Sequence, residues 1–151
     1  EDPAWHERAE AVAARVRDVS ELLAGAGPKP GGEVVVTVTY DAPCHLMHAQ
    51  RVVTAPLAVL GAVPGLTRVP LEGSEHCCGS AGIYNLIEPD VSDRVLAPKL
   101  ANIAATSASL VVTGNPGCLM QIGAGLKQAK MSARVVHPVD VLDASYGRDR
   151  G

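Results

Sequence analysis

The chain has 151 residues, of which 47% are hydrophobic and 19% charged, so it is the size of one ordinary domain and can bury a sizeable core. A formal net charge of −3 and an aromatic content of 3% argue against a nucleic-acid partner. No run approaches the roughly 20 apolar residues of a membrane span, and no basic-then-apolar signal segment is present. We therefore expect a cytoplasmic protein without a transmembrane segment.

Apolar residues recur at helical steps at the start of the chain, which predicts an amphipathic helix over about residues 4–24. The apolar stripe consists of Trp5, Ala9, Val12, Val16, Val19 and Leu23. Glycine and proline then dominate residues 25–32, which is typical of a linker. We predict an N-terminal helix over 1–24, a linker over 25–32 and an α/β domain over 33–151. An equal alternative is that the helix is simply the first helix of that domain.

Strand and helix patterns alternate along the rest of the chain. Strands are predicted at about 33–40, 65–71, 110–113 and 133–136, and helices at about 45–61, 83–106, 119–130 and 138–146. Pro56 is expected to kink its helix or to start the second half of it. In the helix over 83–106, Pro89-Asp90 is a start signal, and Pro98 is expected to divide or bend the helix. This alternation predicts an α/β fold with a four-stranded parallel, Rossmann-like sheet and helices on both faces, in three layers.

All four cysteines lie in loops that follow predicted strands. Cys44 follows the first strand, Cys77 and Cys78 follow the second, and Cys118 follows the third. The carboxyl ends of parallel strands meet at one edge of a sheet, where binding sites form. The sequence therefore predicts that the four thiols gather at one edge, where His137 follows the fourth strand.

Four thiols in a protein without an export signal favour a metal or redox site over structural disulfides. Thiolates are soft ligands, suited to an iron–sulfur cluster or to zinc. The paired Cys-x-x-Cys knuckles of many structural zinc sites are absent from the sequence. Buried thiols that pack as small apolar side chains are the alternative. The sequence contains no phosphate-binding loop and no Gly-x-Gly-x-x-Gly motif after the first strand. A nucleotide ligand is therefore not indicated.

Three motifs resemble the CCG cysteine-rich domain of heterodisulfide reductase subunits and related iron–sulfur oxidoreductases. They are Asp41-Ala-Pro-Cys-His-Leu-Met-His-Ala-Gln50, Glu75-His-Cys-Cys-Gly-Ser-Ala-Gly-Ile-Tyr-Asn85 and Thr113-Gly-Asn-Pro-Gly-Cys-Leu-Met-Gln-Ile122. Their sequences most resemble the C-terminal CCG domain of glycolate oxidase iron–sulfur subunits. The resemblance covers about residues 12–146.

The resemblance implies a parent protein with an N-terminal ferredoxin-like region and an earlier CCG copy. It also implies a complex that oxidises glycolate at a flavin in partner subunits and passes electrons toward the quinone pool. Such a complex is expected in the cytoplasm, peripheral at the inner face of the membrane. The isolated domain would then contribute no catalytic residue and would not oxidise glycolate by itself.

The family resemblance makes Cys44, Cys77, Cys78 and Cys118 the expected ligands. The fullest CCG motif ends in Cys-x-x-Cys and supplies five thiolates to a noncubane 4Fe–4S cluster, whereas this chain has Asn115 at the first of those positions. Four thiolates suit an ordinary 4Fe–4S cluster or a zinc ion, and a noncubane cluster would need Asn115 or a histidine to complete it. His45, His76 and Asn115 are predicted to orient the thiolates or tune their potential.

Two other functions stay open from the sequence. One is a zinc-stabilised interaction domain that holds a complex together without carrying electrons. The other is a redox domain that acts directly on thiols or disulfides, as the heterodisulfide reductase relatives do.

Overall fold

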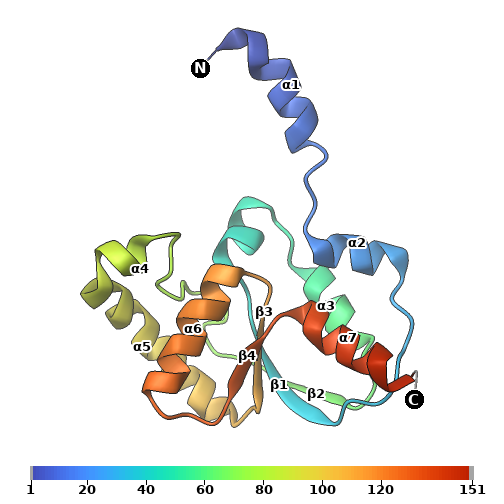
Figure 1. The fold of residues 1–151 in the computed structure, drawn as a ribbon, viewed down its shortest axis with the longest axis vertical. Coiled ribbons are helices and arrows are strands. Elements are labelled where there is room, and N and C mark those ends of the chain that lie inside the picture. The colour runs from blue at the N-terminus through green and yellow to red at the C-terminus, as the bar shows by residue number, and fades with distance from the viewer. Residues whose placement is uncertain (1, 150–151) are drawn as a thin grey trace.

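A four-stranded parallel sheet forms the centre of the molecule (Figure 1). The computed structural model describes residues 2–149. The strand order is β2-β1-β3-β4, and the strands are β1 (Val36–Asp41), β2 (Leu66–Val69), β3 (Leu110–Thr113) and β4 (Arg134–Val136). Each neighbouring pair is parallel. The predicted sheet is thus confirmed, and β1 and β3 occupy its centre.

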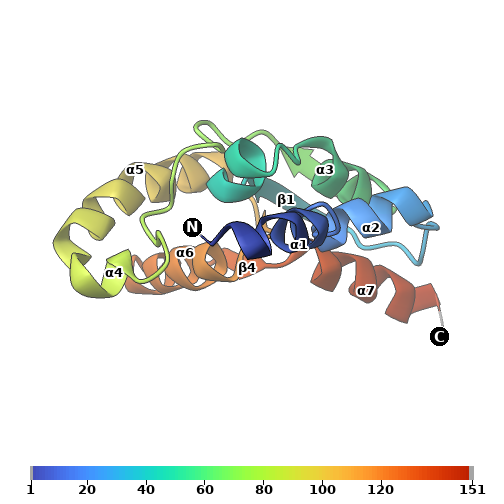
Figure 2. The same cartoon turned by 90° about the horizontal axis from the view of Figure 1, so that it is seen from above.

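Helices cover both faces of this sheet, which confirms the three-layer α/β fold (Figure 2). One face carries α2 (Val19–Ala26), α3 (Thr54–Gly61) and α7 (Pro138–Asp149), and the other carries α5 (Pro89–Thr106) and α6 (Pro116–Gln128). Each layer interface has its own buried cluster. Neighbouring residues of β3 serve both, because Val112 faces the cluster under α3 and α7 whereas Val111 faces the cluster under α5 and α6.

The predicted single helix over residues 4–24 is wrong, because the structure has two helices there. The first is α1 (Pro3–Ala13) and the second is α2. Asp18 breaks the run by forming a capping box with Glu21 at the start of α2. No residue of α1 is buried, and α1 extends away from the α/β body (Figure 1).

The segment over residues 25–32 ends against α7. The backbone N–H of Gly32 donates to the carbonyl of Ser145, whose hydroxyl donates back to the Gly32 carbonyl. A Cβ on Gly31 would lie 2.7 Å from the Ser145 side-chain oxygen, so glycine permits this close approach.

Two further helix predictions need correction. The helix expected over 45–61 consists of a π-helical turn, η1 (His45–Ala49), and α3, separated by a break at Arg51 with φ +59°. The helix expected over 83–106 is a short α4 (Tyr84–Ile87) followed by α5. Pro98 does not divide α5, which continues through it. Within the described residues no helix has the length and hydrophobicity needed to cross a membrane.

Candidate metal centre

The cysteines lie in three segments that follow β1, β2 and β3. Cys44 immediately precedes η1, Cys77 and Cys78 lie in the loop after β2, and Cys118 occupies the first turn of α6. The sulfurs of Cys78 and Cys118 form a hydrogen-bonded pair 3.1 Å apart. The thiol of Cys44 interacts with that of Cys77. Cys78 and Cys118 are buried, whereas Cys44 and Cys77 are partly exposed.

The loop carrying Cys77 and Cys78 is shaped by Gly79. Its φ is +89°, a left-handed conformation that favours glycine. In this conformation the Gly79 N–H donates to the sulfur of Cys77 over 3.3 Å. A Cβ at position 79 would lie only 2.6 Å from the carbonyl oxygen of Ser92. Glycine is therefore required both by the backbone angle and by the neighbouring helix α5.

A network of polar side chains connects this loop to the helices α5 and α6. The hydroxyl of Ser92 donates to the Gly79 carbonyl over 2.8 Å. Gln121 on α6 donates to the Ser92 oxygen over 2.9 Å, and its own carbonyl accepts from Asn85 over 2.8 Å. These bonds join the loop after β2 to α5 and α6. Sequence reasoning did not identify Ser92 or Gln121.

The paired thiols have opposite pKa shifts. The hydrogen bond with Cys118 lowers the pKa of Cys78 to about 7, although burial opposes this change. The same bond, together with burial, raises the pKa of Cys118. For Cys44, burial is the main cause of a raised pKa, and Cys77 adds to it. Cys78 is therefore the thiol of this pair that ionises near neutral pH, with the proton kept on Cys118.

Asn115 caps the helix that carries Cys118. Its side-chain oxygen accepts from the Cys118 N–H over 3.0 Å, and its amide nitrogen lies 3.4 Å from Nδ1 of His45. His76 instead points to solvent, with 75% of its side chain exposed and its Nε2 3.6 Å from a carboxylate oxygen of Glu75. His137 caps α7, since its Nδ1 accepts from the N–H of Val139. Asn115 and His45 thus contact each other beside the cysteine segments, whereas His76 and His137 make other contacts.

A buried ion pair lies under the cysteine segments. Lys99 on α5 contacts Asp41 at the end of β1, and both side chains are 2% exposed. The sequence did contain a signal for this pair. Lys99 falls on the apolar side of its helix, three residues after Leu96 and four before Ile103, both of which are buried. A charged residue at such a position needs a buried partner.

The donor set suits a soft metal centre, but the thiols stand closer together than a bound centre requires. Zinc–sulfur bonds of about 2.3 Å in tetrahedral geometry separate two sulfurs by about 3.8 Å, compared with 3.1 Å for Cys78 and Cys118. Within residues 2–149, no three His, Cys, Asp or Glu side chains are placed to hold a metal ion. A cluster is larger than one ion, so these thiols would have to separate further to bind one.

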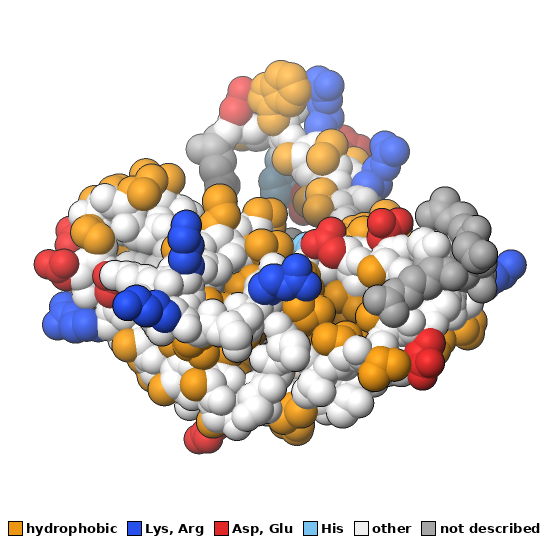
Figure 3. All heavy atoms as spheres, turned by 60° about the horizontal axis from the view of Figure 1, so that its bottom comes forward, with side chains coloured by type: hydrophobic (Ala, Val, Ile, Leu, Met, Phe, Trp, Pro, Cys, Tyr) orange, Lys and Arg blue, Asp and Glu red, His pale blue; other side chains and the backbone are white. Residues whose placement is uncertain are grey.

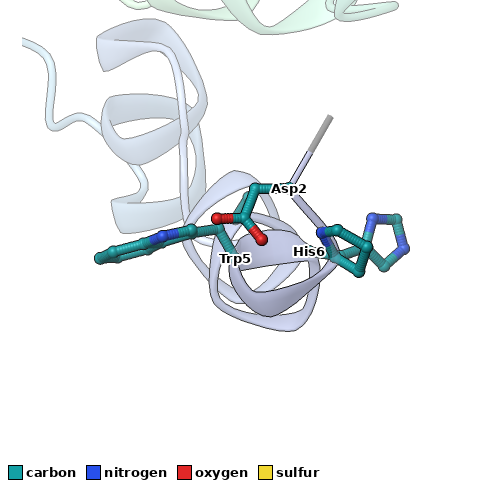
Figure 4. A pocket seen from close by; sticks show the side chains of 5 residues that line it. Asp2, Trp5 and His6 are labelled. Atoms are coloured by element: carbon teal, nitrogen blue, oxygen red, sulfur yellow. The ribbon is translucent and has the colours of Figure 1, made fainter.

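Two other surface features contain no such group of side chains from separate loops. A shallow hollow lined by Asp2, Trp5 and His6 belongs to α1 and its cap alone (Figure 4). On the face shown in Figure 3, charged side chains of both signs are scattered among hydrophobic and uncharged atoms. At the cysteine edge, in contrast, reactive thiols from separate loops approach one another.

Comparison with known proteins identifies relatives of the whole chain. It is 37% identical over 152 aligned residues to "Probable glycolate oxidase iron-sulfur subunit" of Bacillus subtilis, covering 97% of this chain and 34% of that protein. It is also 32% identical to "Lactate utilization protein A" of an Exiguobacterium species and 31% identical to that of Shouchella clausii. These alignments cover 95% of this chain and 59% and 61% of those proteins. The chain therefore spans between about a third and three fifths of these relatives.

A family model described as "CCG: Cysteine-rich domain" matches residues 38–123. The match includes all four cysteines, most of β1, the strands β2 and β3, and the cysteine-bearing segments that follow these three strands. Together with the parallel sheet and the thiols at its carboxyl edge, it shows that this chain belongs to the CCG cysteine-rich domain family.

Proposed function

We propose that this domain holds an iron–sulfur cluster through Cys44, Cys77, Cys78 and Cys118 and carries electrons within a glycolate-oxidase-type complex. The observation that carries the proposal is the approach of thiols from three separate loops at one sheet edge. The names of the relatives, an iron–sulfur subunit and lactate utilization proteins, support the same class of function.

Each part of the site has a role in this proposal. The cluster supplies one-electron transfer. The thiolates hold it, with Cys44 and Cys77 on the solvent side and Cys78 and Cys118 on the buried side. The N–H of Gly79, which donates to the Cys77 sulfur, stabilises negative charge on that ligand. Asn115 orients Cys118 by capping α6.

Four thiolates lead us to propose an ordinary 4Fe–4S cluster. Flavin-containing partner subunits would supply the electrons, and the quinone pool would receive them through the complex. We place that complex in the cytoplasm, at the inner face of the membrane. Oxidation of glycolate would take place in the partner subunits.

Anaerobic reconstitution with ferrous iron and sulfide tests this proposal. We expect the chain to retain both elements and to give an electron paramagnetic resonance signal after reduction. Replacing any one cysteine by serine should reduce iron retention strongly, whereas Ser109→Ala, an exposed change before β3, should not. A chain that retains zinc but no iron or sulfide would favour the zinc-stabilised interaction domain and would contradict electron transfer.

The contact between Cys78 and Cys118 also favours a second candidate, thiol–disulfide exchange. A Cys78 thiolate would attack a substrate disulfide and release one thiol. The Cys118 sulfur, after losing its proton, would then displace the second thiol and form the Cys78–Cys118 disulfide. Two electrons pass to the substrate in this sequence. Turnover of a small disulfide with a thiol reductant, lost in Cys78→Ser, would favour this function, and no turnover above the uncatalysed rate would exclude it.

A further inference from the structure

The three cysteine segments share one buried ion pair. Asp41 is the last residue of β1, and Lys99 lies in the middle of α5. The ammonium of Lys99 is 2.5 Å from one carboxylate oxygen of Asp41. The other carboxylate oxygen accepts a hydrogen bond of 3.0 Å from Thr113, the last residue of β3. The pair therefore joins the ends of the two central strands, from which the chain continues to Cys44 and Cys118.

Lys99 also holds the third segment. Its ammonium donates to the carbonyls of Gly73 and Ser74, each over 3.2 Å, in the turn that precedes Cys77. The carbonyl of Ser74 in turn accepts from the N–H of Ala42, which follows β1. All three ammonium N–H groups are thus used by Asp41 and the two carbonyls. Lys99 has no donor left for a thiolate, so it acts on the site through position and charge.

Stability alone does not explain this pair. Burying two charges is expensive, and apolar side chains of similar volume often serve a core equally well. Removing one member, in contrast, leaves an unpaired buried charge. Since both side chains are 2% exposed, solvent screens the field of either charge only weakly at the adjoining thiols.

We propose that Asp41 and Lys99 are positioning residues that fix the three cysteine segments relative to one another and set the charge around the metallocentre. The charge part of this inference rests on the proposed function. Lys99 favours the electron-rich state of the centre, and Asp41 opposes it.

The positioning part is tested without metal. Hydrogen exchange of the backbone amides over residues 73–79 is measured in the wild-type chain and in Lys99→Met. Loss of the charged hydrogen bonds should accelerate exchange there by roughly 10- to 100-fold. Lys127→Met removes an exposed lysine from α6 and should leave exchange unchanged. Equal exchange in the wild type and Lys99→Met would overturn the positioning role, whether or not the chain binds a cluster.

The charge part is tested by redox titration after anaerobic loading with ferrous iron and sulfide. Asp41→Asn should raise the midpoint potential, and Lys99→Met should lower it. The double variant Asp41→Asn/Lys99→Met, which keeps the net charge, should lie between them. Loss of structure alone would not shift the midpoint potentials of the two single variants in opposite directions. Asp93→Asn, an exposed change on α5, and Lys127→Met are the matched controls.

Shifts of the same sign in both single variants, or shifts no larger than those of the controls, would overturn the charge role. If a single variant fails to fold, the charge-neutral double variant takes its place in the exchange experiment. Faster exchange over 73–79 in the folded double variant supports positioning by the pair, and wild-type exchange contradicts it. A wild-type chain that takes up no iron would contradict the proposed function, and the exchange result would still decide the positioning role.

Discussion

Cys78 and Cys118 are 40 positions apart in the sequence, yet their sulfurs lie 3.1 Å apart in the fold. The contact brings together the loop after β2 and the first turn of α6. It lowers the pKa of Cys78 to about 7 and raises the pKa of Cys118. Above about pH 7, one proton is therefore held between two buried sulfurs, and the pair carries about one negative charge before any metal binds.

Removing the Cys118 thiol should raise the pKa of Cys78. The hydrogen bond with Cys118 is the main cause of the lowered pKa, and burial opposes it, so Cys118→Ala leaves burial to dominate. The measurement is the rate of Cys78 alkylation against pH in a background with Cys44→Ser and Cys77→Ser. The midpoint should move from about 7 to above the ordinary cysteine value of about 8.5.

Cys118→Ser is the matched control for this experiment. Its hydroxyl can still donate to the Cys78 thiolate, so the midpoint should remain below that of Cys118→Ala. An identical midpoint in the parent and in Cys118→Ala would show that the contact does not control ionisation of Cys78.

Gly79→Ala should destabilise the chain more than Gly82→Ala. Both glycines have positive φ, +89° at Gly79 and +71° at Gly82, so alanine is strained at either position by about 1 kcal/mol or more. At position 79 the new Cβ would also lie 2.6 Å from the Ser92 carbonyl, whereas nothing lies within 4 Å at position 82. We expect a loss of about 3 kcal/mol for Gly79→Ala and about 1 kcal/mol for Gly82→Ala.

Urea denaturation of the metal-free chain measures both variants, and the difference between them isolates the contact with Ser92. Equal losses at the two positions would mean that the loop moves away from α5 at little cost.

The convergence of the cysteine segments could be predicted because it depends on topology. A parallel sheet places the ends of β1, β2 and β3 at one edge, so Cys44, Cys77 and Cys118 approach one another even if the element boundaries are misplaced by a few residues. Element boundaries were harder to predict where capping competes with periodicity. The apolar stripe continues through Asp18, but the capping box with Glu21 starts a new helix there.

The buried polar network could not be predicted from local sequence patterns. Ser92 and Gln121 become partners only when α5 and α6 pack side by side, and neither residue has a local motif that signals this. At Pro98, in contrast, the local pattern predicted an interruption of the helix that the structure does not have. The Pro98 ring lies on the exposed side of α5, and the helix continues because packing of the other side against the sheet compensates for the lost backbone hydrogen bond.

Ser92→Ala should destabilise the metal-free chain by about 1–3 kcal/mol. The hydroxyl of Ser92 both donates to the Gly79 carbonyl and accepts from Gln121, so its removal leaves two polar groups without these partners. Urea denaturation measures the loss. Ser109→Ala, at an exposed position, should change stability by less than about 0.5 kcal/mol. A loss for Ser92→Ala as small as that of Ser109→Ala would show that the network adds little to the folded state.

Tyr40 should make the chain sensitive to alkali. Burial raises the pKa of its hydroxyl, and the nearby carboxylates of Asp41 and Asp18 add to the rise. In the unfolded chain a tyrosine loses its proton near pH 10, whereas the folded chain keeps the proton on Tyr40. The unfolded state therefore binds fewer protons above about pH 10, so this group makes stability fall as pH rises toward the folded pKa.

Tyr40→Phe removes the titrating hydroxyl. The urea midpoint of this variant should fall less steeply above about pH 10 than that of the wild type. Tyr84→Phe serves as the control, since Tyr84 is 40% exposed on α4, and it should keep the wild-type slope. Parallel curves for the wild type and Tyr40→Phe would show that the hydroxyl of Tyr40 ionises as readily in the folded chain as in the unfolded one.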